Sequence, residues 1–580
     1  MQIYQKYMKG QSVSTIKYNY YFAMSLLLPN FAGENEKLLI IMEKLITTIA
    51  LSMTMSVMTF AQTAKPLEDV NHVVDNTPDS INKALMARPA PGSTSKGDNP
   101  VLFMIGNSTM RNGTLGNGNN GQWGWGFFEH KYFDANRISV ENQALGGMST
   151  RTFYNVLWPS IREALKPGDW VIISIGHNDG GPIDSGRARS VLSGTSHDSV
   201  CVTIKETGVK ETVYTYGGYM RKYIAEIRKA GANPILMSLT PRNAKDDQGK
   251  TVRKPQGKWL EEIAAEQDVP YVDLNEISGQ KLDNYGDWKM SYHFYKDKIH
   301  TSKFGAEMNA RSAAEGIAAC THPALKPLQA MMVNMELPVV NVKREKGKPV
   351  VFITGDSTVK NEDRDPDSMW GWGSVANTIF DEKKITIANC AKAGRSTRTY
   401  LNEGRWDQVY NSLQPGDYVL LQFGHNDIGP IDTQRMRGVI PGTSDSTHVY
   451  KMEDSGRYEL VYTFGWYLRK FIQDVREKGA TPIIVSLTPR NRWKDGKIER
   501  RNDTYGKWYR EVAEQTNTEF VDVHNITADY LDKKCGSKEK ADKYYKRDHT
   551  HTSLTGAKTN AKSMAKGLKK IKSGLAKYLK

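Results

Sequence analysis

The 580-residue chain contains one long stretch of sequence twice, at a separation of 248 residues. Residues 214–243 read YTYGGYMRKYIAEIRKAGANPILMSLTPRN and residues 462–491 read YTFGWYLRKFIQDVREKGATPIIVSLTPRN, with 18 of 30 positions identical. Shorter matched blocks keep nearly the same separation: WGWG at 123–126 and 370–373, GHND at 176–179 and 424–427, and GTS at 194–196 and 442–444. A repeat of this length predicts two copies of one domain and excludes a short-period solenoid.

The repeat predicts how the chain is divided. We expect the first copy at residues 99–325, an interdomain linker at 326–347 and the second copy at 348–580. Residues 62–98 are polar and rich in proline, which is typical of a linker or loose extension.

The first 61 residues are expected to be a leader that contains a signal peptide. A short charged start at Met42 precedes an apolar stretch that ends before Ala61, where cleavage is expected. Because this stretch is shorter than the roughly 20 apolar residues of a spanning helix, a permanent anchor is the weaker alternative. We therefore expect a secreted or periplasmic protein without stable membrane insertion. Met42 is an alternative start of translation.

Composition excludes several classes of protein. With 39% hydrophobic and 25% charged residues the chain is an ordinary globular protein, neither disordered nor collagen-like. Four cysteines without a CxxC pair are too few for a disulfide framework and give no metal motif, so we expect no metal and no cofactor. The net charge of +15 favours an anionic partner. For a secreted protein an acidic polysaccharide is the favoured partner, and nucleic acid is not expected.

Each copy alternates short apolar runs with helical patterns. The helical patterns end at Gly231 and Gly479. Strand, helix and strand in succession predict an α/β fold, with a parallel sheet covered by helices on both faces and a ligand site at the carboxyl ends of the strands. The predicted buried strands are 101–105, 170–175 and 235–239 in the first copy, and 350–354, 418–423 and 483–487 in the second.

A serine follows the first predicted strand of each copy. Ser357 lies in GDST and Ser108 in GNST, each on a glycine turn where we expect a helix to begin. Free backbone N–H groups beside such a serine suit a nucleophile whose attack generates an oxyanion. The alternative is an ordinary helix N-cap serine.

An aspartate stands three residues before a histidine near the far end of each copy. The pairs are Asp548 with His551, and Asp297 with His300. On a turn this spacing lets the carboxylate hold one imidazole nitrogen while the other faces the serine, as in a serine hydrolase. A single pair of this kind would more often be a surface contact. Its recurrence opposite a serine in both copies favours catalysis.

Two further matched blocks supply candidate oxyanion donors. Gly394 and Gly147 offer a backbone N–H, and Asn426 and Asn178 offer a side-chain amide. Plain turns are the alternative for all four residues.

Together these blocks resemble the SGNH, or GDSL, hydrolase superfamily over both copies. The motifs GDST, NxAxxGRS, GHND and DxxH, with GWG and RGxxPGT, are most similar to rhamnogalacturonan acetylesterases of carbohydrate esterase family 12. The resemblance implies two tandem three-layer α/β/α sandwiches. In the second copy it implies a nucleophile, general base and orienting carboxylate at Ser357, His551 and Asp548, and an oxyanion hole from the N–H groups of Ser357 and Gly394 with the Asn426 side chain. In the first copy the matching residues are Ser108, His300, Asp297, Gly147 and Asn178.

The first copy departs from this pattern in three places. Asn107 replaces the motif aspartate, Met148 stands where the second copy has Arg395, and RSVLS at 189–193 replaces RGVIP at 437–441. Because its triad and oxyanion positions are all present, we expect the first copy to be active with an altered rate or specificity.

The expected substrate is an acetylated acidic polysaccharide. Arg395 and Arg437 border the expected site, and guanidinium groups suit the carboxylates of galacturonate. Trp372 is a candidate for stacking on a sugar ring, with a core anchor as the alternative. The resemblance thus implies hydrolysis of acetyl esters on rhamnogalacturonan. The alternatives are an acetylesterase for xylan or other glycans, a lipase-like esterase, and a copy that acts as a non-catalytic polysaccharide-binding module.

Overall fold

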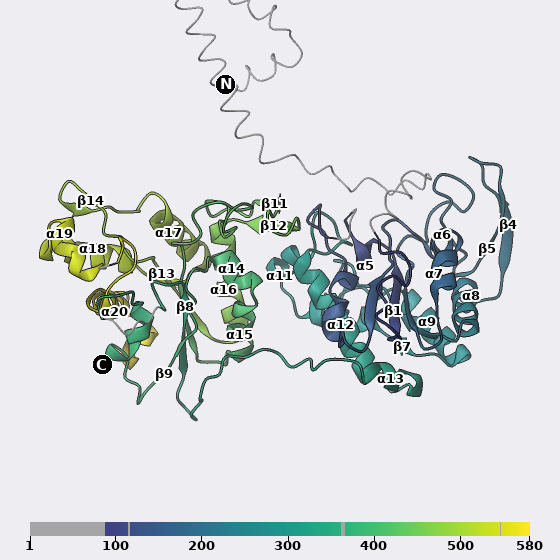
Figure 1. Cartoon of the computed structure of the whole chain (residues 1–580), viewed down its shortest axis with the longest axis horizontal. Helices are drawn as coiled ribbons and strands as arrows, with labels where there is room; N and C mark the ends of the chain where they lie inside the picture. The colour runs from purple at the N-terminus through teal and green to yellow at the C-terminus, as the bar shows by residue number, and fades with distance from the viewer. Residues whose placement is uncertain (1–87, 114–116, 361–365, 546) are drawn as a thin grey trace, which may run out of the picture. The chain divides into compact units, whose positions relative to one another are not determined.

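The structure, a computed structural model, describes residues 88–113, 117–360, 366–545 and 547–580 (Figure 1). The expected leader and signal peptide lie outside the described residues, as does most of the expected linker at 62–98. Within the described ranges, none of the helices is both long enough and apolar enough to cross a membrane.

Each copy forms a five-stranded parallel sheet, which confirms the predicted α/β class (Figure 1). The strand order of the first copy is β2-β1-β3-β6-β7, and that of the second is β9-β8-β10-β13-β16. The strands of the first sheet are β1 (Val101–Gly106), β2 (Ser139–Asn142), β3 (Trp170–Ser174), β6 (Asn233–Met237) and β7 (Tyr271–Val272). Those of the second are β8 (Val350–Gly355), β9 (Thr386–Asn389), β10 (Tyr418–Gln422), β13 (Thr481–Val485) and β16 (Glu519–Val521).

Alternate residues of the central strands pack into two different cores. In β1, Phe103 contributes to one buried cluster and Leu102 to another. In β8, Phe352 and Val351 divide in the same way. Because neighbouring side chains on a strand point to opposite faces, both faces of each sheet are covered, and each copy is a three-layer α/β/α sandwich.

The helices divide between the two faces of each sheet. On one face lie α6 (Thr150–Val156), α7 (Trp158–Ala164), α8 (Tyr216–Lys229) and α9 (Gln256–Gln267) in the first copy, and α14 (Thr397–Asn402), α15 (Arg405–Ser412), α16 (Phe464–Glu477) and α17 (Tyr505–Thr516) in the second. On the other face lie α10 (Leu274–Asp283) and α12 (Lys303–Ala319) in the first copy, and α18 (Val523–Lys534) and α20 (Leu554–Lys570) in the second.

Shorter elements complete each copy. In the first copy they are α5 (Ser108–Arg111), α11 (Asp287–His293), α13 (Lys326–Gln329) and the hairpin of β4 (Ser199–Thr203) and β5 (Lys210–Tyr214). In the second they are α19 (Lys538–Ala541), the hairpin of β11 (Thr447–Lys451) and β12 (Tyr458–Tyr462), and the two-residue strands β14 (Trp493–Lys494) and β15 (Lys497–Ile498).

The expected linkers prove to be partly built into the domains. Arg88 donates hydrogen bonds to the backbone and side chain of Gln143, so residues 88–98 begin as part of the first domain. Leu328 of α13 is fully buried in the first domain's core. At the other end, Arg344 pairs with Asp417 of the second domain at 2.7 Å. The tertiary contacts of these polar segments could not be inferred from their composition.

Candidate active site

The turn after β8 presents Ser357 at the carboxyl end of the sheet. Gly355 ends the strand, and a Cβ there would lie 2.5 Å from the carbonyl oxygen of Gln422, so a larger residue would push the neighbouring strand away. Asp356 then holds the turn, because its Oδ1 accepts hydrogen bonds from Thr358 N (2.9 Å) and Oγ1 (2.8 Å). Ser357 is 9% exposed. The expected helix starts at the corresponding serine of the first copy, in α5, whereas Ser357 lies in a turn.

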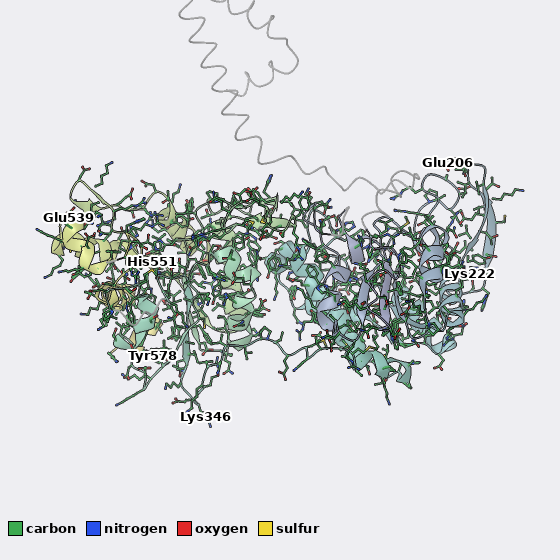
Figure 2. The ribbon with its side chains drawn as sticks, in the orientation of Figure 1. Glu206, Lys222, Lys346, Glu539, His551 and Tyr578 are labelled. Carbon is green, nitrogen blue, oxygen red and sulfur yellow. The ribbon has the colours of Figure 1, made fainter. Side chains whose placement is uncertain are left out.

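The second copy brings Ser357, His551 and Asp548 together, although 194 residues separate the serine from the histidine. His551 Nε2 lies 2.8 Å from Ser357 Oγ, and His551 Nδ1 lies 2.7 Å from Asp548 Oδ2. The other carboxylate oxygen of Asp548 accepts the backbone N–H groups of Thr550 (2.6 Å) and His551 (2.7 Å). Figure 2 marks His551 in this copy. These two backbone hydrogen bonds fix the carboxylate, and the carboxylate in turn orients the imidazole of His551.

The first copy repeats this geometry. His300 Nε2 lies 2.8 Å from Ser108 Oγ, and His300 Nδ1 lies 2.7 Å from Asp297 Oδ2. Here Gln122, which precedes Trp123, donates an additional hydrogen bond to Asp297 at 3.3 Å. The matching position of the second copy is Met369, whose side chain has no N–H or O–H to donate. Asn107 keeps the two contacts of Asp356, since its Oδ1 accepts from Thr109 N (3.2 Å) and Oγ1 (3.0 Å). The substitution at 107 therefore preserves the turn.

Both orienting carboxylates are held in their charged form. Burial by itself would raise the pKa of Asp297, but hydrogen bonds from the His300 side chain and from nearby backbone N–H groups lower that pKa to about 2. The pKa of Asp548 is lowered below its usual value by the same kinds of contact, against the same effect of burial. A carboxylate charged at neutral pH can stabilise an imidazolium as it forms.

Asn426, a candidate oxyanion donor, hydrogen-bonds to the residue that follows the other candidate, Gly394. Gly394 has φ +80°, a conformation that favours glycine. Asn426 donates one amide hydrogen to the carbonyl oxygen of Arg395 (3.1 Å), and the described residues offer this nitrogen no second acceptor. Because an amide carries two hydrogens, one remains for a ligand. In the first copy, Gly147 has φ +78° and Asn178 donates to Met148 O at 3.0 Å.

The arginines expected to bind substrate make contacts within the protein. Arg437 Nη1 donates to the carbonyl oxygen of Gly394 at 3.3 Å. It therefore holds the segment between β9 and α14, residues 390–396, which is called the oxyanion loop below. Arg395 Nε pairs with the carboxylate of Glu403 at 2.9 Å. Neither contact could be foreseen, because both depend on how the loops fold.

The expectation that Trp372 stacks on a sugar is corrected by the structure. Its side chain is completely buried, and its Nε1 donates a hydrogen bond to Gln422 Oε1 at 2.7 Å. No ring face is left for a substrate, so Trp372 is a core anchor, the alternative stated above.

Asp427 is a functional candidate that motif reasoning passed over, although it is the last residue of GHND. Its buried carboxylate accepts the backbone N–H of Thr397 at 3.0 Å and the Thr397 hydroxyl at 2.5 Å, which fixes the start of α14 behind the oxyanion loop. Burial raises the pKa of Asp427 to about 7, and burial raises that of its counterpart Asp179 to about 6. The presence of this aspartate in both GHND motifs was the sequence signal that could have identified it.

Positive charge gathers beside the second triad. Arg490 has its pKa lowered to about 10, first by burial and then by the charges of Arg501 and Arg492, while Asp356 and Asp548 act in the opposite direction. Arg492 also reaches His549, at 3.3 Å between Nη2 and Nε2. Such a cluster favours an anionic ligand.

Comparison with known proteins agrees with this geometry. The family model described as "GDSL-like Lipase/Acylhydrolase family" matches residues 104–308 and 353–558. A rhamnogalacturonan acetylesterase of Emericella nidulans is 32% identical over 228 residues, which are 39% of this chain and 86% of that protein. Rhamnogalacturonan acetylesterase RhgT of Bacillus subtilis is 30% identical over 239 residues, 39% of this chain and 91% of that protein.

Among solved structures, the acetylxylan esterase Axe2 of Geobacillus stearothermophilus aligns with a TM-score of 0.27 and 18% identity over 39% of this chain and 96% of that one. The family match covers more than half of the chain and both triads, which confirms the resemblance drawn from the motifs. The chain belongs to the GDSL-like lipase/acylhydrolase family in both of its copies, and it is an esterase.

Proposed function

We propose that the protein is a carbohydrate acetylesterase that removes acetyl groups from pectic polysaccharide of the rhamnogalacturonan type. The observation that carries this proposal is the Ser-His-Asp contact chain, present in both copies with the same 2.8 and 2.7 Å distances. The names of the two relatives support the acetyl ester and the rhamnogalacturonan substrate.

Acylation begins when Ser357 Oγ attacks the acetyl carbonyl carbon and His551 Nε2 accepts the hydroxyl proton. The resulting imidazolium is stabilised by the charged Asp548. The negative charge that develops on the carbonyl oxygen is met by the N–H groups of Ser357 and Gly394 and by the Asn426 amide. His551 then donates its proton to the sugar oxygen as the bond between this oxygen and the acetyl carbon breaks. The sugar departs as an alcohol, and the acetyl group stays bound to Ser357.

Deacylation repeats these steps with water as the nucleophile. His551 accepts a proton from the water as its oxygen attacks the acetyl-enzyme. Collapse of the second tetrahedral intermediate releases acetate and returns the proton to Ser357. In the first copy, Ser108, His300 and Asp297 perform the same roles, so we propose that both copies turn over.

The positive charge of the protein supports the proposal of an acidic substrate. The Arg490 cluster beside the second triad suits galacturonate carboxylates, and the chain as a whole carries +15. A polysaccharide substrate lies outside the cell, which agrees with the signal peptide expected at residues 42–61. We therefore propose that the protein is secreted or periplasmic.

Three serine variants of the full chain test the proposal. Ser108→Ala and Ser357→Ala should each keep part of the acetate release from acetylated rhamnogalacturonan, and the double variant should lose it. Ser455→Ala, at an exposed serine in a hairpin turn, is the matched control and should behave as wild type. Persistent acetate release by the double variant would overturn the triad assignment. Faster release from acetylated xylan than from rhamnogalacturonan would replace the proposed substrate with a neutral glycan.

A further inference from the structure

The outer face of α20 in the second copy carries a row of lysines (Figure 1). Residues 552–580 contain eight lysines and no aspartate or glutamate. Within α20 the exposed side chains are Thr555, Lys558, Lys562, Lys566, Lys569 and Lys570. Because residues four apart are neighbours on one face of a helix, the lysines at 558, 562, 566 and 570 form a line. These four residues are called the lysine stripe below.

The lysine stripe has no counter-charge within the protein. Among the described residues, none of its four lysines forms an ion pair with a carboxylate. The opposite face of α20 is buried in the core of the second domain through Ala557, Ala561, Met564 and Leu568. Like charges one turn apart repel each other and destabilise a helix, so a bound anion would relieve this repulsion.

The matching helix of the first copy, α12, has a surface of mixed charge instead. Positions 558, 562 and 566 of the stripe correspond to Glu307, Arg311 and Glu315. Arg311 pairs with Glu315 at 2.7 Å, and Lys281 of α10 pairs with the same carboxylate at 2.6 Å. Lys131 pairs with Glu307 at 2.9 Å. An exposed helix at this place in the fold therefore needs no row of a single charge, and the stripe distinguishes the second copy.

A tyrosine adds an exposed aromatic ring on the neighbouring helix. α18 packs against α20, and Tyr530 of α18 is 44% exposed. Tyr530 matches Lys281, whose ammonium reaches across to Glu315, the counterpart of Lys566. An aromatic side chain offers an apolar face on which a sugar ring can stack. The lysine stripe and this ring together suit a ligand that has both sugar rings and negative charges.

A linear polymer fits this face better than a membrane surface does. A helix that lies on a membrane inserts apolar side chains into the lipid, but those of α20 are buried in the domain core. Lysine ammonium groups on flexible stems do not demand one fixed geometry, which suits carboxylates that recur along a chain. α20 begins at Leu554, three residues after His551, so the lysine stripe leads away from the candidate active site.

We propose that the lysine stripe and Tyr530 form a docking surface for a carboxylate-bearing polysaccharide, separate from the triad that cleaves the acetyl ester. The ammonium groups pair with carboxylates along the polymer while Tyr530 stacks on a sugar ring. The docked polymer keeps further acetyl esters close to Ser357 at a raised effective concentration. The inference rests on the proposed acetylesterase function, and it adds a binding site that acts on polymers and leaves short esters unaffected.

The test uses the full chain with Ser108→Ala, so that the second copy alone turns over. Replacement of all four stripe lysines by Gln should weaken binding to polygalacturonate by roughly 10- to 100-fold, because four exposed ion pairs are lost. It should also raise KM on acetylated rhamnogalacturonan polymer, whereas kcat and KM on a small acetyl ester should not change. Replacement of the same lysines by Arg should keep the binding. Tyr530→Ser should weaken it several-fold without abolishing its dependence on salt.

The matched control removes the same charge from exposed lysines of the first copy, with the combined substitutions Lys166→Gln, Lys210→Gln, Lys229→Gln and Lys250→Gln. It should bind polygalacturonate as the parent chain does. Equal binding by the control and the stripe variant would overturn the docking surface. Stronger retention of the parent chain on anionic lipid vesicles or DNA than on polygalacturonate would overturn the proposed partner. Absence of acetate release from every ester would instead overturn the proposed function, while polygalacturonate binding would still report on the docking surface.

Discussion

Arg437 donates a hydrogen bond to the carbonyl oxygen of Gly394, with 3.3 Å between Nη1 and O. Arg189 makes the same contact with Gly147 in the first copy, at 3.2 Å. The glycine that carries a candidate oxyanion donor is therefore held by an arginine through its carbonyl oxygen in both copies, even though the residues after these arginines differ. This contact turns an arginine expected to bind substrate into a positioning residue.

Replacement of this arginine should affect the chemical step more than substrate binding. In a Ser108→Ala chain, Arg437→Gln should lower kcat roughly tenfold, less than loss of a direct oxyanion donor, because it acts through the Gly394 peptide. KM should change little. Arg435→Gln, at the exposed arginine two residues earlier, is the control and should keep wild-type kinetics. A rise in KM at constant kcat would return Arg437 to substrate binding.

Removal of the Asn426 side-chain amide should lower kcat more than replacement of Arg437 does. Asn426→Ala in the Ser108→Ala chain should lower kcat by roughly 10²- to 10³-fold, because the developing charge loses a preorganised donor. Asn178→Ala in the Ser357→Ala chain should have the same effect on the first copy. Steady-state kinetics on a small acetyl ester measure both. The exposed Asn402→Ala serves as control, and an unchanged kcat in Asn426→Ala would contradict the proposed hole.

Asp427 should make the second domain less stable as pH rises. Its carboxyl has a pKa of about 7 in the folded chain against a usual value of 3.8. Between these values the folded state binds more protons than the unfolded state, so the stability it contributes is present in full below 3.8 and is lost as pH rises through about 7. Asp427→Asn, which resembles the neutral carboxyl, should remove this loss.

Thermal unfolding at pH 5, 6, 7 and 8 measures the effect as the difference in Tm between variant and wild type, which should grow toward pH 8. Asp179→Asn provides the comparison. Burial raises the pKa of Asp179 to about 6, so its pH-dependent difference should level off about one pH unit earlier. A difference in Tm that is the same at every pH would show that Asp427 titrates normally.

Trp372 and Trp125 are both fully buried, but they differ in one hydrogen bond. Trp372 Nε1 donates to Gln422, whereas Trp125 Nε1 has no partner among the described residues. Trp372→Phe should therefore destabilise its domain by about 1–3 kcal/mol more than Trp125→Phe destabilises the first, because it leaves Gln422 Oε1 unpaired. Hydrogen exchange resolved by domain measures this. Equal losses would contradict it, and a raised KM would revive the sugar-stacking interpretation.

Much of the fold could be predicted because its signals are local in the sequence. The buried runs at β1, β3, β8 and β10 were found to within a residue or two, since a strand covered on both faces must be apolar along its length. The edge strands β2, β7, β9 and β16 and the hairpins were missed, because two to four residues, or an exposed alternating pattern, carry no comparable signal.

The sequence by itself determined the duplication, the parallel α/β class and the order in which the motifs occur along each copy. These follow from matching residues 248 positions apart and from hydrophobic periodicity, which are both visible along the chain without knowledge of which residues are in contact. Only the tertiary structure decided that Arg395 pairs with Glu403, that Trp372 is buried and that Arg437 bonds to the carbonyl oxygen of Gly394. Such contacts arise where segments far apart in the sequence meet in the folded domain, and no motif specifies them.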